Sequence, residues 1–196
     1  MSPVEETSER ILQAASRVFS RAGYAGATTR AIADEANVNE VTLFRHFGSK
    51  KNLLMAVIER FSAVPDLGAA LENQLTGDYR QDLLRIGRIF LEMLNRHRKV
   101  ILMMICEAQH RHEVREAIAQ TPLQQSQMLA QYLRQQIERG VVRELANPEL
   151  AAQMFFGTFF EYSIGQTLAD PSAPQMPSEQ SVEQIVDIFV EGTIKR

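Results

Sequence analysis

The sequence predicts an all-α protein in which a small N-terminal domain of three helices precedes a larger helical domain, with about nine helices in total. Apolar residues recur three and four positions apart along most of the chain, which is the pattern of amphipathic helices. No segment shows the sustained alternation of β-branched residues that a strand requires. We place the boundary between domains 1–62 and 63–196 at Val64-Pro65, because proline disfavours helix in the residue before it.

The first predicted helix spans about 7–22 and ends at Gly23, a residue that commonly terminates helices. One face of this helix carries only apolar residues, namely Ile11, Leu12, Ala15, Val18, Phe19 and Ala22. We expect this face to be buried.

Residues 28–50, TTRAIADEANVNEVTLFRHFGSK, predict two short helices joined by a tight turn. Thr28 can cap the first helix, and Asn37 tolerates the positive φ that a sharp turn needs. The second helix, 40–47, would bury Leu43. This is the layout of a helix-turn-helix that reads DNA. Two packed helices also occur in ordinary helical cores, but the Thr, Arg, His and Lys side chains gathered on one surface favour DNA.

Ser49 can cap a fourth helix over about 49–61. Beyond it, Gly77, Gly140 and the Asn147-Pro148 pair separate further helical segments. We expect these at about 67–75, 79–96, 99–119, 122–140, 148–169 and 179–194, the third of them open to a break near His110.

The composition is that of a globular protein. Of the 196 residues, 45% are hydrophobic and 23% are charged, so the chain can bury a core. No run of about 18 apolar residues is present, so we expect no transmembrane helix. The polar start MSPVEETSER lacks the features of a signal peptide, and the single Cys106 excludes an intramolecular disulfide. We therefore expect a cytoplasmic location.

Charge is distributed unevenly along the chain. The net charge is −3, but residues 8–52 carry seven Lys and Arg residues against four acidic ones, a net of +3, and the rest carries −6. A basic segment on an acidic body fits a DNA-binding domain attached to a domain that does not touch DNA. Because the basic excess is modest, we expect useful affinity to require a dimer.

The segments TTRAIA, ANV, TLFRHF and SKKNLL, together with the preceding RILQAASRVFSRAGYAGAT, closely follow a known pattern. Over residues 8–58 the chain resembles the N-terminal domain of the TetR family of bacterial transcriptional repressors. Two positions depart from that family's pattern. Asn37 replaces the usual turn glycine, and Phe44 replaces a tyrosine whose hydroxyl can reach a phosphate in relatives.

The resemblance implies contacts of two kinds with operator DNA. Contacts to phosphates are implied for Thr28, Thr42, His46 and Lys50. Base edges would be met by Arg30, Glu40, Val41 and Arg45. Arginine can pair with guanine, glutamate can accept from cytosine N4, and valine can touch a thymine methyl. An acid facing DNA weakens binding unless it reads a base, so Glu40 is either a specificity residue or turned away.

The last two predicted helices, 148–169 and 179–194, carry wide apolar arcs. They can be helices buried within one chain, or they can form a symmetric four-helix interface between two chains, as the resemblance implies. On the second interpretation the interface residues are Phe156, Phe160, Val186 and Val190. The homodimer would then bind two half-sites of a palindromic operator.

Large apolar and flexible side chains are frequent in the middle of the chain, and they indicate a cavity for a mainly apolar small-molecule effector. We expect it to be lined by Phe90, Met93, Met103, Met104, Met128, Tyr132, Met154 and Phe155, with Glu107, Gln109 or His110 orienting one polar or cationic group. A filled core without a cavity is the alternative.

Motifs of catalysis and cofactor binding are missing from the sequence. It contains no glycine-rich phosphate loop, no GxSxG and no HExxH, so we expect neither enzyme activity nor a cofactor. Cys106, Glu107, His110 and His112 could bind a soft metal ion, but Glu107-x-x-His110 is only half of a di-iron motif, and we expect no metal.

The sequence therefore predicts a homodimeric DNA-binding repressor that a small, mainly apolar ligand releases from its operator. Two alternatives remain open. One is an effector-independent DNA-binding factor on the same scaffold, associated with the nucleoid or with division. The other is an enzyme with a vestigial DNA-binding domain.

Overall fold

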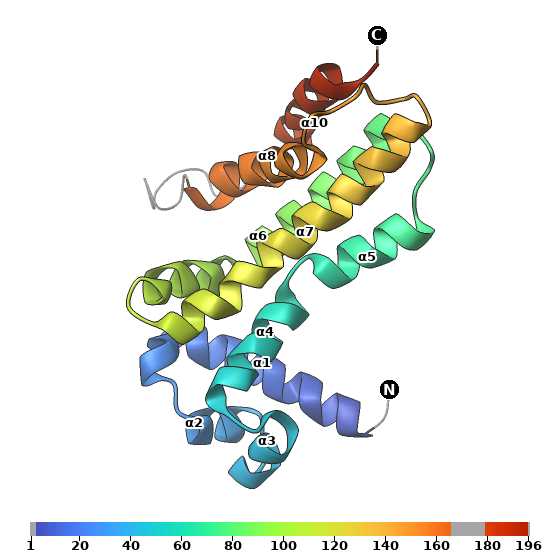
Figure 1. Ribbon diagram of the computed structural model, residues 1–196. Helices are drawn as coiled ribbons and strands as arrows, with labels where there is room; N and C mark the ends of the chain where they lie inside the picture. Colours follow the sequence, from blue (N-terminus) through green and yellow to red (C-terminus); the bar gives the residue numbers. More distant parts are fainter. Residues whose placement is uncertain (1–2, 166–178, 196) are drawn as a thin grey trace. The chain divides into compact units, whose positions relative to one another are not determined.

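The computed structural model describes residues 3–165 and 179–195 (Figure 1). This part of the chain is helical apart from its connections and one isolated antiparallel bridge between Val142 and Ile194, which confirms the all-α prediction. None of the helices described is long and apolar enough to cross a membrane. The described residues divide into two compact units: unit 1 is 3–62 with 97–121, and unit 2 is 63–96 with 122–165 and 179–195.

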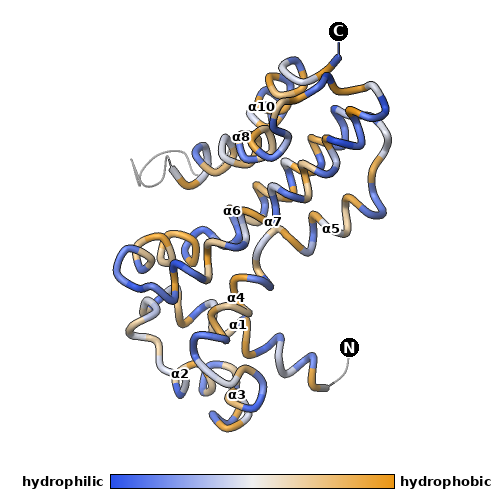
Figure 2. Tube along the Cα trace, in the orientation of Figure 1, coloured by the Kyte–Doolittle hydropathy of each residue, from blue (hydrophilic) through white to orange (hydrophobic). Residues whose placement is uncertain are grey.

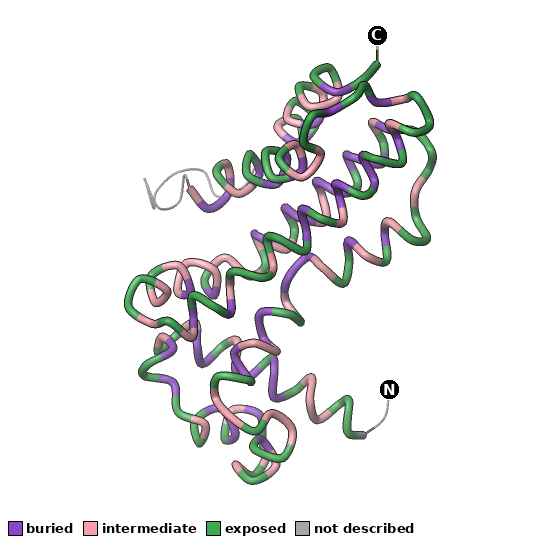
Figure 3. The backbone as a smooth tube through the Cα atoms, in the orientation of Figure 1, coloured by how far each residue is buried: buried purple, intermediate pink, exposed green. Residues whose placement is uncertain are grey.

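Unit 1 begins with four helices, α1 (Pro3–Gly26), α2 (Thr29–Glu35), α3 (Glu40–Phe47) and α4 (Lys50–Phe61). Their apolar faces meet in a core whose fully buried side chains include Ile11, Phe19, Ile32, Leu43 and Leu53. Figure 3 shows buried and exposed residues alternating along α1 and α4, as amphipathic helices require. The expected end of the first helix, at Gly23, is a kink with φ 68°, after which α1 continues for one turn.

Unit 1 also contains the end of α6 (Tyr79–Ala108) and the start of α7 (His112–Glu138). Val100, Met104 and Val114 are buried in the same apolar cluster as Ile11 and Phe19. The predicted domain boundary at residue 62 assigns these three side chains to the second domain, because a single boundary divides the chain by sequence order alone. The structure groups them by the core that they fill.

Unit 2 contains α5 (Val64–Asn73), the rest of α6 and α7, α8 (Pro148–Phe160), the π-helical turn η1 (Glu161–Gly165) and α10 (Glu179–Thr193). The Phe155 ring lies at the centre of its aromatic core, 5.2 Å from the centroid of Phe159 and 5.0 Å from that of Phe189. A Cβ added at Gly87 of α6 would lie 2.7 Å from the ζ-carbon of Phe159, so glycine lets α6 and α8 approach closely. Figure 2 shows apolar and hydrophilic residues alternating along these helices.

Two expected helix breaks are wrong. α6 runs without interruption through 96–99, because that segment contains no glycine or proline. α7 continues through Pro122, although proline inside a helix removes one backbone hydrogen bond and costs about 3 kcal/mol. Buried residues on both sides of Pro122, Ala117 and Leu129, offset that cost. The break near His110 is present between α6 and α7.

Two further helix limits differ from expectation. α5 begins at Val64, so the chain is already helical at the Val64-Pro65 pair where we expected a break. Proline is tolerated there because the first turn of a helix does not use its backbone N–H groups in hydrogen bonds within the helix. α8 gives way to η1 after Phe160, and the end of the predicted helix 148–169 lies outside the described residues.

Candidate nucleic-acid interface

Side-chain caps and one left-handed residue shape the corner between α2 and α3. The Thr28 hydroxyl accepts from the Ala31 backbone N–H at 3.0 Å, and the Asn39 side chain accepts from that of Val41 at 2.8 Å. Asn37 adopts φ 52°, as predicted for the turn. The Val38 backbone N–H then donates to the Ala33 carbonyl at 3.0 Å, which closes the corner.

Helix α3, the predicted recognition helix, buries Leu43 in unit 1 and leaves its other face accessible. Val41 is 74% exposed, Phe44 is 44% exposed, and Arg45 is exposed. Arg30, in the first turn of α2, is exposed as well. The structure thus places three of the four predicted base-contacting residues, all but Glu40, on accessible surface of the same two helices.

Glu40, the fourth predicted base contact, is half-buried. Its Oε1 accepts a hydrogen bond from the Thr29 hydroxyl at 2.5 Å. Sequence reasoning missed this bond, because Thr29 and Glu40 are 11 residues apart and meet only through the turn.

The four predicted phosphate contacts lie at different depths. Thr28 is exposed, and Thr42, His46 and Lys50 are half-buried. The Lys50 ammonium lies 4.5 Å from the centroid of the Tyr24 ring, a cation–π contact. Burial lowers the pKa of Lys50, the Arg111 cation lowers it further, and the Glu107 carboxylate opposes both.

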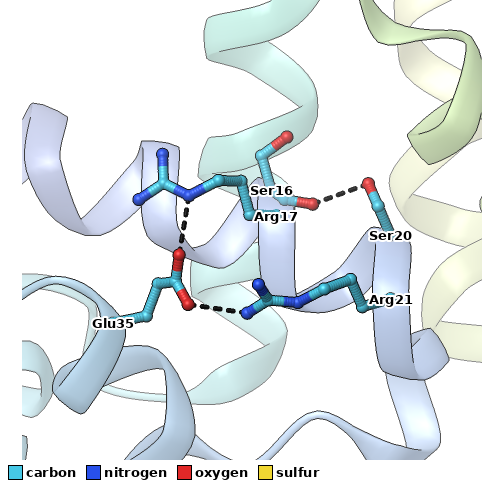
Figure 4. Close-up of polar contacts among 5 residues, drawn as sticks. All are labelled: Ser16, Arg17, Ser20, Arg21 and Glu35. Atoms are coloured by element: carbon cyan, nitrogen blue, oxygen red, sulfur yellow. Dashed lines mark hydrogen bonds and ion pairs between the residues drawn. The ribbon is translucent and has the colours of Figure 1, made fainter.

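A bridge between α1 and α2 fixes the scaffold behind these residues. Glu35 accepts from Arg17 Nε at 2.8 Å and from an Arg21 terminal nitrogen at 2.6 Å, so both of its oxygens are bonded (Figure 4). In the same view the Ser20 hydroxyl donates to the Ser16 carbonyl at 2.8 Å. The hydrogen bond from Arg21, and then that from Arg17, holds the pKa of Glu35 below its usual value.

Most basic side chains of residues 8–52 have a partner within unit 1. Arg17 and Arg21 bond Glu35, Lys51 pairs with Glu116 at 2.9 Å, and an Arg10 terminal nitrogen reaches the Asn37 carbonyl at 3.5 Å. Lys50 lies against Tyr24. Among the described residues, Arg30 and Arg45 have neither a hydrogen bond nor an ion pair. The two guanidinium groups that remain free are therefore those predicted to read bases.

The predicted pocket residues are divided between the two units. Phe90, Tyr132 and Phe155 are buried in unit 2, where Met93 and Met128 are half-buried. The others belong to unit 1: Met104 is buried in its core, Met103 packs against that core, Glu107 bonds Arg111 at 2.8 Å, and His110 is exposed.

Two of the side chains considered as metal ligands have other partners, and a third is exposed. His112 lies 3.6 Å from Glu116, Glu107 is paired with Arg111, and Cys106 is exposed. Within residues 3–165 and 179–195, no group of three or more His, Cys, Asp and Glu side chains is arranged to hold a metal ion.

α8 and α10 place the predicted dimer residues mainly inward. Phe156 and Val186 are buried in the core of unit 2, whereas Phe160 and Val190 are half-buried. The apolar side chains left exposed on these helices are Leu150, Met154 (63%) and Ile188 (73%). Any second chain that covers α8 and α10 would meet these side chains first.

A buried polar network in unit 2 left no signal in the sequence. The Asp82 carboxylate is 1% exposed and accepts from the Thr76 backbone N–H at 2.7 Å, the Thr76 hydroxyl at 2.8 Å and the Tyr132 hydroxyl at 3.0 Å. In α7, the helix that carries Tyr132, Gln125 Nε2 and Gln136 Oε1 are buried without a hydrogen-bond partner among the described residues.

Family models match both parts of the chain. Residues 11–57 match the model described as bacterial regulatory proteins, tetR family, and residues 73–187 match the tetracyclin repressor-like C-terminal domain. The chain is 33% identical to the HTH-type transcriptional regulator YvkB of Bacillus subtilis, over 95% of this chain and 96% of the relative. It is 26% identical to the HTH-type regulator Rv1556 of Mycobacterium tuberculosis, over 100% of this chain and 91% of that one.

Solved structures share the fold at lower identity. A complex of SmeT with triclosan has a TM-score of 0.76 at 22% identity, covering 97% of this chain and 92% of that one. The regulator FadR of Bacillus subtilis, solved with stearoyl-CoA, has a TM-score of 0.74 at 20% identity, covering 94% and 98%.

Proposed function

The chain belongs to the TetR family of bacterial regulatory proteins, and from this premise we propose that it is a homodimeric repressor that reads a palindromic operator with Arg30, Glu40, Val41 and Arg45. One observation supports the assignment of the base contacts. Arg30 on α2 and Arg45 on α3 are exposed and are unpaired within the described residues, while the other basic residues of 8–52 have partners in unit 1. A free guanidinium can pair with O6 and N7 of guanine.

The test begins with an operator selected from random DNA by the wild-type protein. Arg45→Ala should lose about 1–3 kcal/mol at particular base pairs and relax the sequence preference there. Lys51→Ala is the matched control, because Lys51 is a neighbouring cation already paired with Glu116. It should leave the preference unchanged. If Arg30→Ala and Arg45→Ala both keep the wild-type preference at every position, the assignment of these residues is wrong.

The dimer is proposed to form through the exposed side of α8 and α10. Leu150, Met154 and Ile188 are large apolar side chains that unit 2 leaves in solvent. Met154→Asp and Ile188→Asp should each yield monomers in sedimentation experiments and weaken operator binding. Leu123→Asp, at an apolar residue of α7 that is 50% exposed, should remain dimeric. A wild-type protein that sediments as a stable monomer at micromolar concentration would contradict the dimer.

We also propose a small, mainly apolar effector in the interior of unit 2, close to Phe90, Tyr132 and Phe155. Of the molecules bound in the two structural relatives, triclosan is largely apolar and stearoyl-CoA carries a long apolar acyl chain. The unpartnered Gln125 amide would donate to an acceptor on the effector, since a buried donor without a partner costs about 1–3 kcal/mol. An effector coupled by about 1–3 kcal/mol would loosen the operator about 5- to 150-fold.

A panel of chlorinated phenols, fatty acids and long-chain acyl-CoA molecules tests this proposal through operator release and thermal shift. An active compound should lose affinity in Gln125→Leu but not in Gln109→Leu, since Gln109 is exposed. If no compound in the panel releases DNA or raises the melting temperature, the effector-independent alternative is favoured. Because a protein that binds operator DNA must be in the compartment that holds the DNA, we expect it to act in the cytoplasm.

A further inference from the structure

The hydrogen bond between Thr29 and Glu40 joins the first residues of the two helices that would face DNA. Thr29 opens α2 and Glu40 opens α3, and the two helices lie together in unit 1 (Figure 1). The Thr29 hydroxyl donates to Glu40 Oε1 at 2.5 Å, because an ionised carboxylate can only accept. Hydrogen bonds to a charged acceptor are shorter and stronger than those between neutral groups.

The bond is not needed to cap either helix. The N-terminus of α2 is capped by the hydroxyl of Thr28, and that of α3 by the side chain of Asn39. Neither Thr29 nor Glu40 takes part in these caps. The bond therefore does something other than terminate a helix.

Comparison with Glu35 shows what an acid that only braces helices looks like in this fold. Both oxygens of Glu35 are bonded to arginines, so its charge is balanced. Glu40 has a single hydrogen bond, at Oε1, and no ion pair within the described residues. Its Oε2 is left to accept from a further donor, and the side chain lies beside the highly exposed Val41.

A carboxylate held in this way selects among bases by charge and by hydrogen bonding. Because the hydroxyl proton of Thr29 is engaged by Glu40, the pair presents only acceptor atoms to DNA. In the major groove, guanine presents the acceptors O6 and N7, and thymine presents O4. Adenine presents its N6 amine beside the acceptor N7, whereas cytosine presents only its N4 amine. The pair thus favours cytosine.

We propose that Thr29 is a positioning residue that makes Glu40 a reader of the exocyclic amine of cytosine. The inference rests on the proposed operator binding by α2 and α3. A free glutamate side chain loses about 1.5–2 kcal/mol of rotamer entropy when it is fixed. The bond to Thr29 fixes Glu40 before DNA arrives, so this loss does not weaken recognition.

The test is a double-mutant cycle on the selected operator. Thr29→Val keeps the shape and helix propensity of threonine but lacks the hydroxyl, Thr29→Ser keeps a hydroxyl, and Glu40→Ala removes the acceptor of the bond. Affinities are measured for the operator and for copies in which each cytosine is replaced by thymine, by adenine or by 2-pyrimidinone, which lacks the N4 amine. Far-UV circular dichroism checks that each variant is folded, and Thr29→Ala is a second variant without a hydroxyl.

At one cytosine of each half-site, the wild type should prefer cytosine by about tenfold, within the range of a single base contact. Thr29→Val and Thr29→Ala should reduce that preference to about twofold and leave all other positions unchanged, and Thr29→Ser should retain it. In the Glu40→Ala background, Thr29→Val should have no further effect.

Three results would overturn the inference while leaving the proposed function intact. Thr29→Val could keep the full preference at every position, it could weaken all sequences equally as a phosphate contact would, or the preferred base could be adenine. A wild-type protein that selects no sequence at all would instead refute the proposed function, and this inference with it.

Discussion

Tyr79 and Tyr132 provide a matched pair for measuring how much the charge of Asp82 contributes to stability. Both rings are buried in unit 2, with centroids 6.3 Å apart, and each hydroxyl has one side-chain partner. Tyr132 donates to the Asp82 carboxylate at 3.0 Å. Tyr79 bonds the Thr193 hydroxyl at 2.8 Å, and because Thr193 donates its own proton to the Phe189 carbonyl, Tyr79 is the donor.

Phenylalanine at either position removes only the hydroxyl and keeps the packing of the ring. A hydrogen bond to a charged group contributes about 1.5–3 kcal/mol, and one between neutral groups about 1 kcal/mol. Tyr132→Phe should therefore cost about 2–3 kcal/mol, because Asp82 is buried and keeps only the two donors of Thr76. Tyr79→Phe should cost about 1 kcal/mol. In a chain of this length the difference corresponds to about 2–8 °C in melting temperature.

Urea denaturation followed by circular dichroism, with ligand-free protein at one fixed concentration, measures both free energies of unfolding. Tyr162→Phe is the control, since its hydroxyl bonds Ser181 at a half-buried position and should cost less than about 0.5 kcal/mol. Equal losses for Tyr132→Phe and Tyr79→Phe would refute the reasoning, because the acceptor's charge would then make no difference.

Three further predictions concern pH, packing and DNA. Burial raises the pKa of Tyr79 to about 12 from 10.0, so its contribution to stability is fully present below pH 10 and is lost as pH rises from 10 to 12. Ionisation also places a negative charge in the core, so the free energy of unfolding should fall by about 2–3 kcal/mol in alkaline unfolding experiments, more than the loss of the hydrogen bond alone. A Tyr79→Phe protein with the same pH slope as the wild type would contradict this. Gly87→Ala should destabilise unit 2 by about 1–3 kcal/mol, because the new methyl group would lie 2.7 Å from the buried ring of Phe159. Gly192→Ala, which has open space around it inside α10, should not lower the melting temperature. Equal effects at the two glycines would show that Phe159 yields without cost. Lys50→Ala should weaken binding to all DNA sequences alike. In fluorescence anisotropy titrations it should also lower the slope of log K against log salt by about one unit. A loss of affinity confined to particular base pairs would mean that Lys50 reads bases.

Local features of unit 1 could be predicted because they depend on residues close in sequence. Thr28 and Ser49 cap the helices that follow them, and Asn37 takes the positive φ that its place in the turn requires. These are contacts over two to four residues, which the sequence displays directly. The free state of Arg30 and Arg45 could not be predicted, because it depends on which acids the folded chain brings to the other basic residues.

The orientation of α8 is the clearest limit of sequence reasoning. The run Phe155, Phe156, Phe159 and Phe160 is apolar over so wide an arc that periodicity cannot fix the rotation of the helix. Three of these rings are buried in unit 2, and the exposed large apolar side chains of α8 are Leu150 and Met154 instead. Asp82 was missed for a related reason, since a buried acid is recognised only through partners such as Tyr132, 50 residues away.

The path of α6 has a practical consequence for dissecting the molecule. One uninterrupted helix supplies residues 79–96 to unit 2 and 97–108 to unit 1. An expression fragment that stops at Ser62 would retain the whole helix-turn-helix but lose Val100, Met104 and Val114 from its core. Such a fragment would leave apolar side chains of α1 and α4 in water and would tend to aggregate. Likewise, limited proteolysis should not release residues 1–62 as a stable piece, because no single cut separates two segments that each fold with a complete interior.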